Sequence, residues 1–223
     1  MATVGNAKLE RRTTAVEVAR ILKQRILAGD YAEDQFIRQE LVAQELGVSR
    51  IPVREALALL ESEGLLVREK DRGAVVPKLS VNEIEQIYSL RSMIEPYLLQ
   101  HAAANITDAQ IEELEQIIAR SRRAASEAEW LDLNIAFHRT LYESADKPLV
   151  LQMLDNLLTR ADRYLKMQRS LSPQTQEESD AEHQRILERV AARDAEGAVA
   201  ALRGHIKWNA QDMQRAVDLL ATP

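Results

Sequence analysis

The sequence predicts a mainly α-helical protein of two domains: a small N-terminal domain interrupted by turns, followed by an all-α antiparallel helical bundle. Glycine and charge are both unevenly distributed along the 223 residues. Five of the seven glycines occur by position 73, and none lies between 74 and 196, a stretch rich in helix-forming residues. Residues 1–78 carry a net charge of +1, and residues 79–223 a net charge of -7. We expect a tail over 1–13, one domain over 14–78 and a second over 79–223.

The composition excludes several classes of protein. Hydrophobic residues make up 46% and charged residues 29% of the chain, and no apolar run approaches the ~20 residues that a membrane-spanning helix needs. Without cysteine there can be no disulfide, thiol nucleophile or thiolate metal site. The polar start MATVGNAKLERR lacks the apolar core of a signal peptide. We therefore expect a cytoplasmic protein that does not engage membranes.

The first domain contains a predicted helix-turn-helix. Apolar periodicity predicts helices over about 14–28 and 38–46. Gly47 then supplies a left-handed turn residue, and Ser49 can N-cap a third helix that has Pro52 in its first turn. The result is two helices joined by a tight turn.

The third helix and the segment after it supply candidate DNA contacts. The apolar residues of this helix share one face, which leaves Ser49, Arg50 and Arg54 exposed at the end where recognition helices meet base edges. The segment LLVREKDRGAVVPK alternates apolar and polar residues around a basic turn, which predicts two short strands like the wing of a winged helix. A helix-turn-helix pattern alone also occurs in proteins that never bind DNA. The predicted wing therefore strengthens the DNA-binding hypothesis beyond what that pattern supports by itself. A local positive surface for phosphates could form from Arg38, Arg50, Arg54, Arg68, Lys70 and Arg72.

The stretch LVAQELGVSRIPVREALALLESEGLLVREKDRGAVV resembles the N-terminal domain of GntR-family bacterial transcription regulators. The resemblance covers about 14–78 and implies a winged helix that binds a short palindromic operator as a dimer. It implies DNA contacts at the positions of Ser49, Arg50, Arg54 and Gly73. Some relatives place a DNA-contacting Arg where this chain has Glu40, and Arg38 is the candidate substitute. With Arg72 from the positive surface, these residues form the predicted DNA-binding set.

The second domain is predicted to be a series of helices with short connections. Thr107 to Gln110 has capping-box spacing, Pro148 lies in a first turn, and Pro173 separates two helices. The predicted helices span about 81–104, 107–124, 128–145, 147–170, 174–193 and 195–220.

Three of the four histidines fall on core-facing positions of three different helices. His138 shares its face with Asn134, one turn earlier, while His183 and His205 lie on the apolar stripes of two later helices. A single inward histidine is more often a satisfied core residue than a ligand. Three imidazoles and one oxygen, if they converge in space, suit a divalent transition metal such as Zn, Ni, Mn or Fe.

The helical region resembles the FCD effector domain of the FadR subfamily over about 83–216. The resemblance rests on LRSMIEP, on the N-x-x-x-H of LNIAFHRTLYESADKPLV, and on the two later histidines. It implies a site in which an Asp and three His grip a divalent ion that can coordinate an organic-acid effector. Asn134 stands where many members have Asp, and a neutral amide oxygen is a weaker ligand than a carboxylate.

Arg91 and Glu95 interrupt the apolar stripe of the first helix of this domain. A buried charge is costly unless it is paired, so an ion pair is one interpretation. The other is that Arg91 donates to an effector carboxylate, as the resemblance also suggests for an Arg near the cavity. Asn209, one turn after His205, could orient a ligand or close a buried hydrogen bond. The candidate effector-binding residues are Arg91, Tyr88, Glu95 and Asn209.

The predicted function is that of a homodimeric, metabolite-responsive transcription regulator, repression being commoner than activation in such families. It would bind DNA through the first domain and a small carboxylate metabolite through the second. Two alternatives stay open. The three histidines could activate water in a metal-dependent hydrolase, although the chain has no HExxH motif and no recognisable general base apart from Glu95. Alternatively, the site has lost its metal, and Arg91 and the histidines bind the effector by hydrogen bonds alone.

Overall fold

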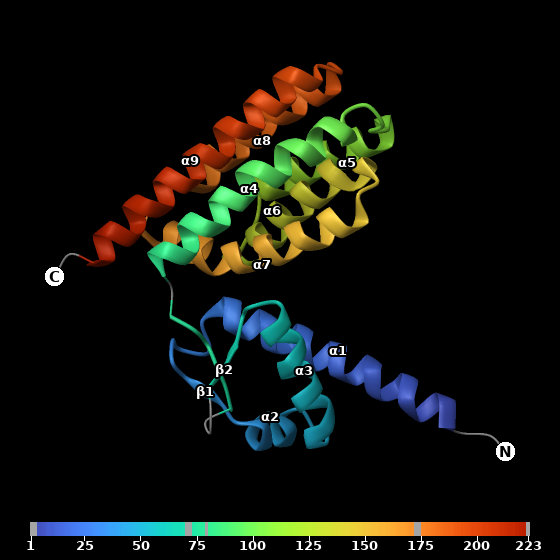
Figure 1. Ribbon diagram of the computed structural model, residues 1–223, viewed down its shortest axis with the longest axis vertical. Coiled ribbons are helices and arrows are strands. Elements are labelled where there is room, and N and C mark those ends of the chain that lie inside the picture. The colour runs from blue at the N-terminus through green and yellow to red at the C-terminus, as the bar shows by residue number, and fades with distance from the viewer. Residues whose placement is uncertain (1–3, 70–72, 79, 172–174, 222–223) are drawn as a thin grey trace. The chain divides into compact units, whose positions relative to one another are not determined.

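The computed structural model describes residues 4–69, 73–78, 80–171 and 175–221, and the chain divides into two compact units, 1–79 and 80–223 (Figure 1). The predicted fold class is confirmed, because the first unit is a winged helix-turn-helix and the second is built of α-helices. In the described part of the chain, no helix has both the length and the apolar character needed to cross a membrane.

The first unit combines helices with a small sheet. Its strands are antiparallel in the order β1-β3-β2, with Phe36 and Val67 both opposite Val75. A core of fully buried side chains, including Leu22 and Leu60, joins the helices to this sheet. The elements are α1 (Val4–Ala28), β1 (Phe36–Ile37), α2 (Gln39–Glu45), α3 (Arg50–Ser62), β2 (Val67–Glu69) and β3 (Gly73–Val75).

Three details of the first unit differ from the sequence predictions. α1 begins at Val4 rather than near residue 14, because the intervening residues include good helix formers and no proline. β1 was not predicted, since a two-residue strand has no detectable alternation. Ser49 is the N-cap residue of α3, as predicted, but its side chain makes no capping hydrogen bond. Gly47 does adopt the expected left-handed conformation, with φ of +64°.

Gly73 occupies a position that excludes a side chain. Its φ is +94°, and a Cβ at this residue would stand 2.3 Å from Cε2 of Phe36. The positive φ favours glycine at this position, and a Cβ here would have to displace the half-exposed ring of Phe36.

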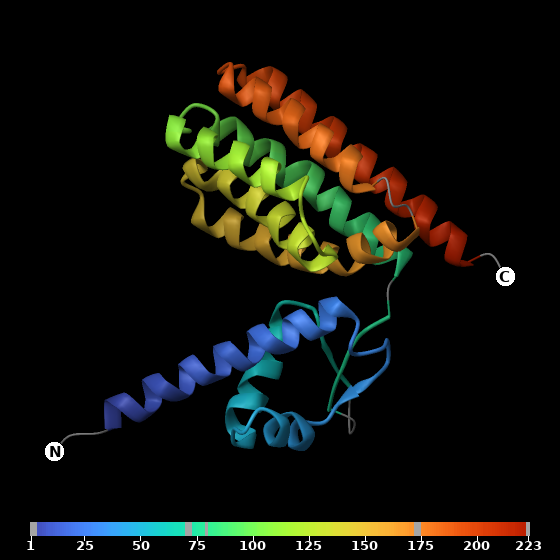
Figure 2. The same ribbon diagram turned by 180° about the vertical axis from the view of Figure 1, so that it is seen from behind.

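The second unit is a bundle whose helices form a closed ring, seen from opposite sides in Figures 1 and 2. Around the ring, each helix packs on the next in the order α4, α9, α8, α5, α6, α7 and back to α4. The predicted capping box of Thr107 and Gln110 is confirmed, and α7 begins at Pro148. Pro173 lies outside the described residues. The elements are α4 (Val81–Ala102), α5 (Asp108–Ser121), α6 (Glu127–Tyr142), η1 (Glu143–Ala145), α7 (Pro148–Leu171), α8 (Thr175–Ala191) and α9 (Ala195–Ala221).

Candidate functional site

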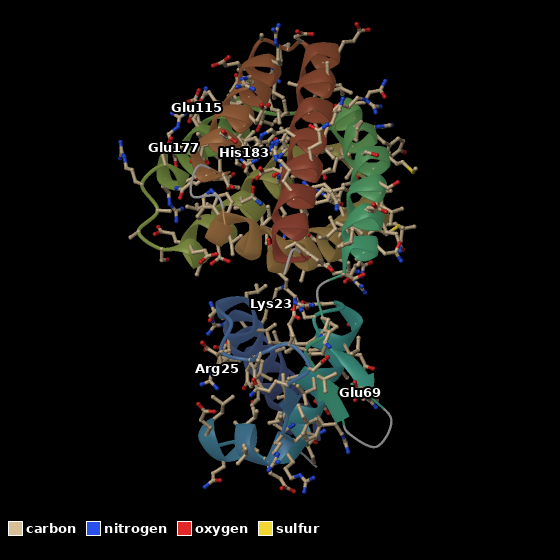
Figure 3. The ribbon with its side chains drawn as sticks, turned by 90° about the vertical axis from the view of Figure 1, so that its left-hand side faces the viewer. Lys23, Arg25, Glu69, Glu115, Glu177 and His183 are labelled. Atoms are coloured by element: carbon tan, nitrogen blue, oxygen red, sulfur yellow. The ribbon has the colours of Figure 1, made fainter. Side chains whose placement is uncertain are left out.

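Three histidines from three helices meet inside the bundle. His138 comes from α6, His183 from α8 and His205 from α9, and each side chain is buried. Their ring centroids lie 4.7 to 5.4 Å apart, and one nitrogen of each ring lies within 4.8 Å of the others. Figure 3 shows His183 among the helices of the bundle. Ligands of one tetrahedral ion at about 2.1 Å lie roughly 3.4 Å from one another, so small side-chain rotations would suffice.

The chemistry of these nitrogens fits a metal ion. Among the described residues, Nε2 of His138 and Nε2 of His183 have no hydrogen-bond partner. Burial lowers the pKa of His183 and of His205 well below the usual range, and the nearby positive groups lower it further. Both imidazoles are therefore neutral at pH 7 and keep a lone pair. A buried lone pair without a partner is costly, and a bound divalent ion would remove that cost.

Glu95 connects this cluster to a buried arginine. The Glu95 carboxylate accepts a hydrogen bond from Nε of Arg91 at 2.5 Å and from the hydroxyl of Tyr142 at 2.7 Å. Its Oε2 also lies 3.2 Å from Nδ1 of His138. Burial by itself would raise the pKa of Glu95, but Arg91 and His138 outweigh it and hold this pKa well below its ordinary value. Glu95 is thus an ionised acceptor that faces Nδ1 of His138, and Nε2 is the ring nitrogen left without a hydrogen-bond partner among the described residues.

The intrahelical ion pair that the sequence suggested for Arg91 and Glu95 is present, and it engages Nε, one of the five N–H donors of the guanidinium. The Arg91 guanidinium carbon also lies 5.0 Å from the ring centre of Tyr88. The Tyr88 hydroxyl is buried without a hydrogen-bond partner among the described residues. Arg91 is therefore positioned by its own helix, between an aromatic face and a carboxylate.

The other predicted ligands of the bundle lie on the histidine-bearing helices. Asn134 is buried on α6, one turn before His138. Asn209 places Nδ2 3.1 Å from Nε2 of His205 and 3.2 Å from the His205 carbonyl oxygen, so it contacts a histidine directly. Tyr142 was missed by sequence reasoning, because an inward tyrosine reads as core. Its spacing of four residues from His138 was the available signal.

The predicted DNA-binding residues lie around α3 of the first unit. Arg50 and Arg54 are exposed near its N-terminal end, beside the exposed Ser49. Nη1 of Arg50 lies 2.9 Å from Oε1 of Glu40 on α2, an ion pair that sequence reasoning did not anticipate. Arg38 is exposed at the N-cap of α2. Gly73 begins the wing strand β3, and Arg72 lies outside the described residues.

A winged helix joined to a helical bundle with a polar interior defines a DNA-binding regulator with a ligand-binding domain. Residues 14–76 match the gntR family of bacterial regulatory proteins, and residues 86–207 match the FCD domain. The chain belongs to the GntR family and carries the FCD domain.

The relatives to which the chain is similar are also named as transcriptional regulators. Over 207 residues the chain is 26% identical to the HTH-type transcriptional regulator YdhC of Bacillus subtilis, covering 88% of this chain and 89% of that protein. Over 154 residues it is 31% identical to the gluconate operon transcriptional repressor of Bacillus licheniformis, covering 67% of this chain and 62% of the relative. The structure of McbR from E. coli has the same fold, with a TM-score of 0.80 at 22% identity over 91% of this chain and 97% of that one. The protein is therefore a transcriptional regulator, and the named relatives support this assignment over the hydrolase alternative.

Proposed function

We propose that the protein is a homodimeric repressor of the FadR subfamily that binds a palindromic operator and senses a small carboxylate metabolite at a divalent transition metal. The observation that carries the proposal is the meeting of three buried histidines beside the buried pair of Arg91 and Glu95. This arrangement joins metal-binding nitrogens to a cationic carboxylate donor inside the bundle. The regulator would act in the bacterial cytoplasm, on the chromosome when bound to its operator.

The metal would be held by His138, His183 and His205, with the Asn134 side-chain oxygen as a fourth ligand. When bound, the ion would supply a positive, Lewis-acidic point for effector oxygens. Glu95 sets the tautomer of His138 by accepting its Nδ1–H, as carboxylates beside metal-ligating histidines do. The Asn209 amide contacts His205 and limits the rotation of that ring.

Arg91 is the proposed anchor for the effector carboxylate. A guanidinium binds a carboxylate by two parallel hydrogen bonds, and in the part of the chain that the structure describes the hydrogen bond from Arg91 to Glu95 comes from Nε. One relative is named for the gluconate operon, and gluconate is an organic acid, which supports this class of effector. Operator affinity changes only if the effector binds two arrangements of the regulator with different affinity.

The DNA half of the proposal is tested by Arg50→Ala and Arg54→Ala. We expect each variant to lose discrimination between operator and unrelated DNA by about 1 to 3 kcal/mol, the usual contribution of a good bidentate base contact. Arg20→Ala is the matched control, because Arg20 is exposed on α1 and paired with Glu17. Fluorescence anisotropy measures the ratio of the affinities for an operator selected from random DNA and for unrelated DNA. If both variants still discriminate fully between operator and unrelated DNA, these arginines do not take part in base recognition.

The sensing half is tested by elemental analysis of protein purified without chelators or a nickel column. Near-stoichiometric Zn, Ni, Mn or Fe is expected in the wild type, with loss in His183→Ala. Small carboxylates should then raise the melting temperature of the loaded protein but not of Arg91→Met. If no metal binds even after reconstitution while carboxylates still act through Arg91, the metal-free alternative replaces this part of the proposal.

A further inference from the structure

A groove of about 440 Å³ lies between α4 and α9, on the outside of the bundle. The lining extends along α4 from Ile84 to Ser92, a rise of about 12 Å at 1.5 Å per residue. The groove is therefore elongated, and its volume is within the range of small-molecule sites. The residues that line it are Ile84, Glu85, Tyr88, Ser89 and Ser92 of α4 and Arg203, Ile206, Lys207, Ala210 and Gln214 of α9.

The floor of the groove is apolar. Ile84, Tyr88 and Ile206 belong to the buried core of the bundle and also line the groove. Both walls are α-helices, whose backbone N–H and C=O groups are already hydrogen-bonded within each helix. A peptide in the groove would find few partners for its own backbone groups, which is costly. A hydrocarbon chain has no such groups to satisfy, and it would remove the apolar floor from water.

Two cations stand on the α9 wall of the groove. Arg203 and Lys207 are both exposed, and they lie one helical turn apart. Within the described part of the chain, neither side chain forms an ion pair or a hydrogen bond. Other arginines on the outside of the bundle do pair with carboxylates, namely Arg139, Arg160, Arg185, Arg189, Arg193 and Arg215. The groove therefore offers two adjacent cations to an anion from solution.

The charges of the groove are arranged along its length. In Figures 1 and 2 the last part of α9 lies next to the first part of α4, so the two helices are antiparallel. Arg203 is therefore level with Ser92, and Glu85 lies about 10 Å away, toward the start of α4. One end of the groove is cationic and the other is acidic, which favours a ligand whose negative charge is confined to one end.

We propose that this groove binds an aliphatic monocarboxylate. The carboxylate would accept charge-assisted hydrogen bonds from Arg203 and Lys207, while the chain would pack along the apolar floor. DNA is a poor occupant, because two cations in a unit whose net charge is -7 do not offset a row of phosphates.

The groove is separate from the histidine cluster, since neither the three histidines nor Arg91 lines it. Tyr88 connects the two places. Its ring lines the groove, and the ring centre lies 5.0 Å from the guanidinium carbon of Arg91. A chain in the groove would thus pack on the ring that Arg91 faces.

The test measures the binding of octanoate to the full-length protein by ligand-observed NMR titration, at concentrations where octanoate forms no micelles. We expect a dissociation constant of about 1 mM or lower, the range open to a ligand of this size. Octylammonium has the same chain and the opposite charge, and it should bind at least ~10-fold more weakly, because it meets two cations instead of pairing with them.

Reversing the charge of the α9 wall should reverse this preference. Arg203→Glu/Lys207→Glu should bind octanoate at least ~10-fold more weakly than the wild type and octylammonium more tightly, a gain that a misfolded protein would not show. The matched control is Arg185→Glu/Arg189→Glu, which makes the same charge change at the same spacing on exposed positions of α8 outside the groove. The control should keep the wild-type preference for octanoate.

A second variant blocks the groove without changing its charge. Ala210 lines the groove, so Ala210→Trp should abolish the binding of octanoate. Ala200→Trp is the control, because Ala200 is exposed on the same helix and does not line the groove. This control should bind octanoate as the wild type does.

The outcomes separate the groove from the proposed function. A wild type that does not bind octanoate well above ~1 mM overturns the inference, as does equal affinity for octanoate and octylammonium. Octanoate binding that is unchanged in both Arg203→Glu/Lys207→Glu and Ala210→Trp places the ligand elsewhere and also overturns it. None of these results bears on metal content or on operator binding, which test the proposed function by themselves.

Discussion

Replacing Glu95 by Gln should destabilise the bundle by about 3 to 5 kcal/mol, the cost of breaking a buried ion pair by removing one partner. Glu95 is fully buried and Arg91 is 2% exposed, so water cannot replace the lost carboxylate charge. The hydrogen bond from Tyr142 and the contact with His138 weaken at the same time. For a unit spanning 80–223, each kcal/mol shifts the melting temperature by about 2 to 4 °C, so a fall of roughly 6 to 20 °C is expected.

Tryptophan fluorescence is the appropriate assay, because Trp130 and Trp208 are the two tryptophans of the chain and both belong to the bundle. Glu85→Gln is the control, since Glu85 is exposed on the same helix and its loss should change the melting temperature little. Metal affinity of Glu95→Gln should also fall by about 10- to 100-fold through the altered His138. If the free energy of unfolding of Glu95→Gln in urea lies within ~1 kcal/mol of the wild-type value, the buried charge of Arg91 is not stabilised by Glu95.

Three further predictions concern other parts of the chain. Asn134→Asp should tighten binding of a divalent ion, because a carboxylate replaces a neutral oxygen; equal affinities in a competition titration would remove Asn134 from the ligands. Gly73→Ala should cost the first unit roughly 1 to 3 kcal/mol, because φ is +94° and the new Cβ would meet Phe36. Amide exchange in β1 and β3 should rise while the tryptophan-detected transition stays unchanged, and unaltered exchange would refute the clash. Burial raises the pKa of Tyr88 to about 12, whereas the unfolded phenol ionises near pH 10. The stability that the buried neutral phenol contributes should therefore be fully present below pH 10. On the order of 3 kcal/mol of it should be lost as the pH rises toward 12, and Tyr88→Phe should show a shallower loss.

The helix faces of the bundle followed from the sequence because periodicity reports which side of a helix is apolar. That reasoning placed His138, His183 and His205 inward, and it recognised that Arg91 and Glu95 at i and i+4 could pair. It could not establish that the histidines meet. Their convergence depends on the order in which helices close the ring, with α9 between α8 and α4, and that order is set by long-range packing.

The misses have local physical causes. Tyr142 was not singled out because a phenol on an apolar stripe looks like core until its hydroxyl is seen to reach Glu95 on another helix. β1 has two residues, too few to alternate. The ion pair of Arg50 with Glu40 joins two helices across the turn, so it depends on an angle between helices that residue spacing does not report.

The pair of Arg50 and Glu40 has a consequence for how the regulator would search a genome. Off the operator, Arg50 already has an anionic partner 2.9 Å away, and an exposed ion pair of this kind is worth less than ~1 kcal/mol. A phosphate of unrelated DNA offers Arg50 an exchange of similar value, whereas a bidentate contact to the correct base gains about 1 to 3 kcal/mol. If Arg50 contacts DNA as proposed, it must first leave Glu40, so this ion pair would subtract less than ~1 kcal/mol from the contact on any sequence. Glu40 would thus weaken binding to the operator and to unrelated DNA alike, and the discrimination between them would have to come from the bases themselves.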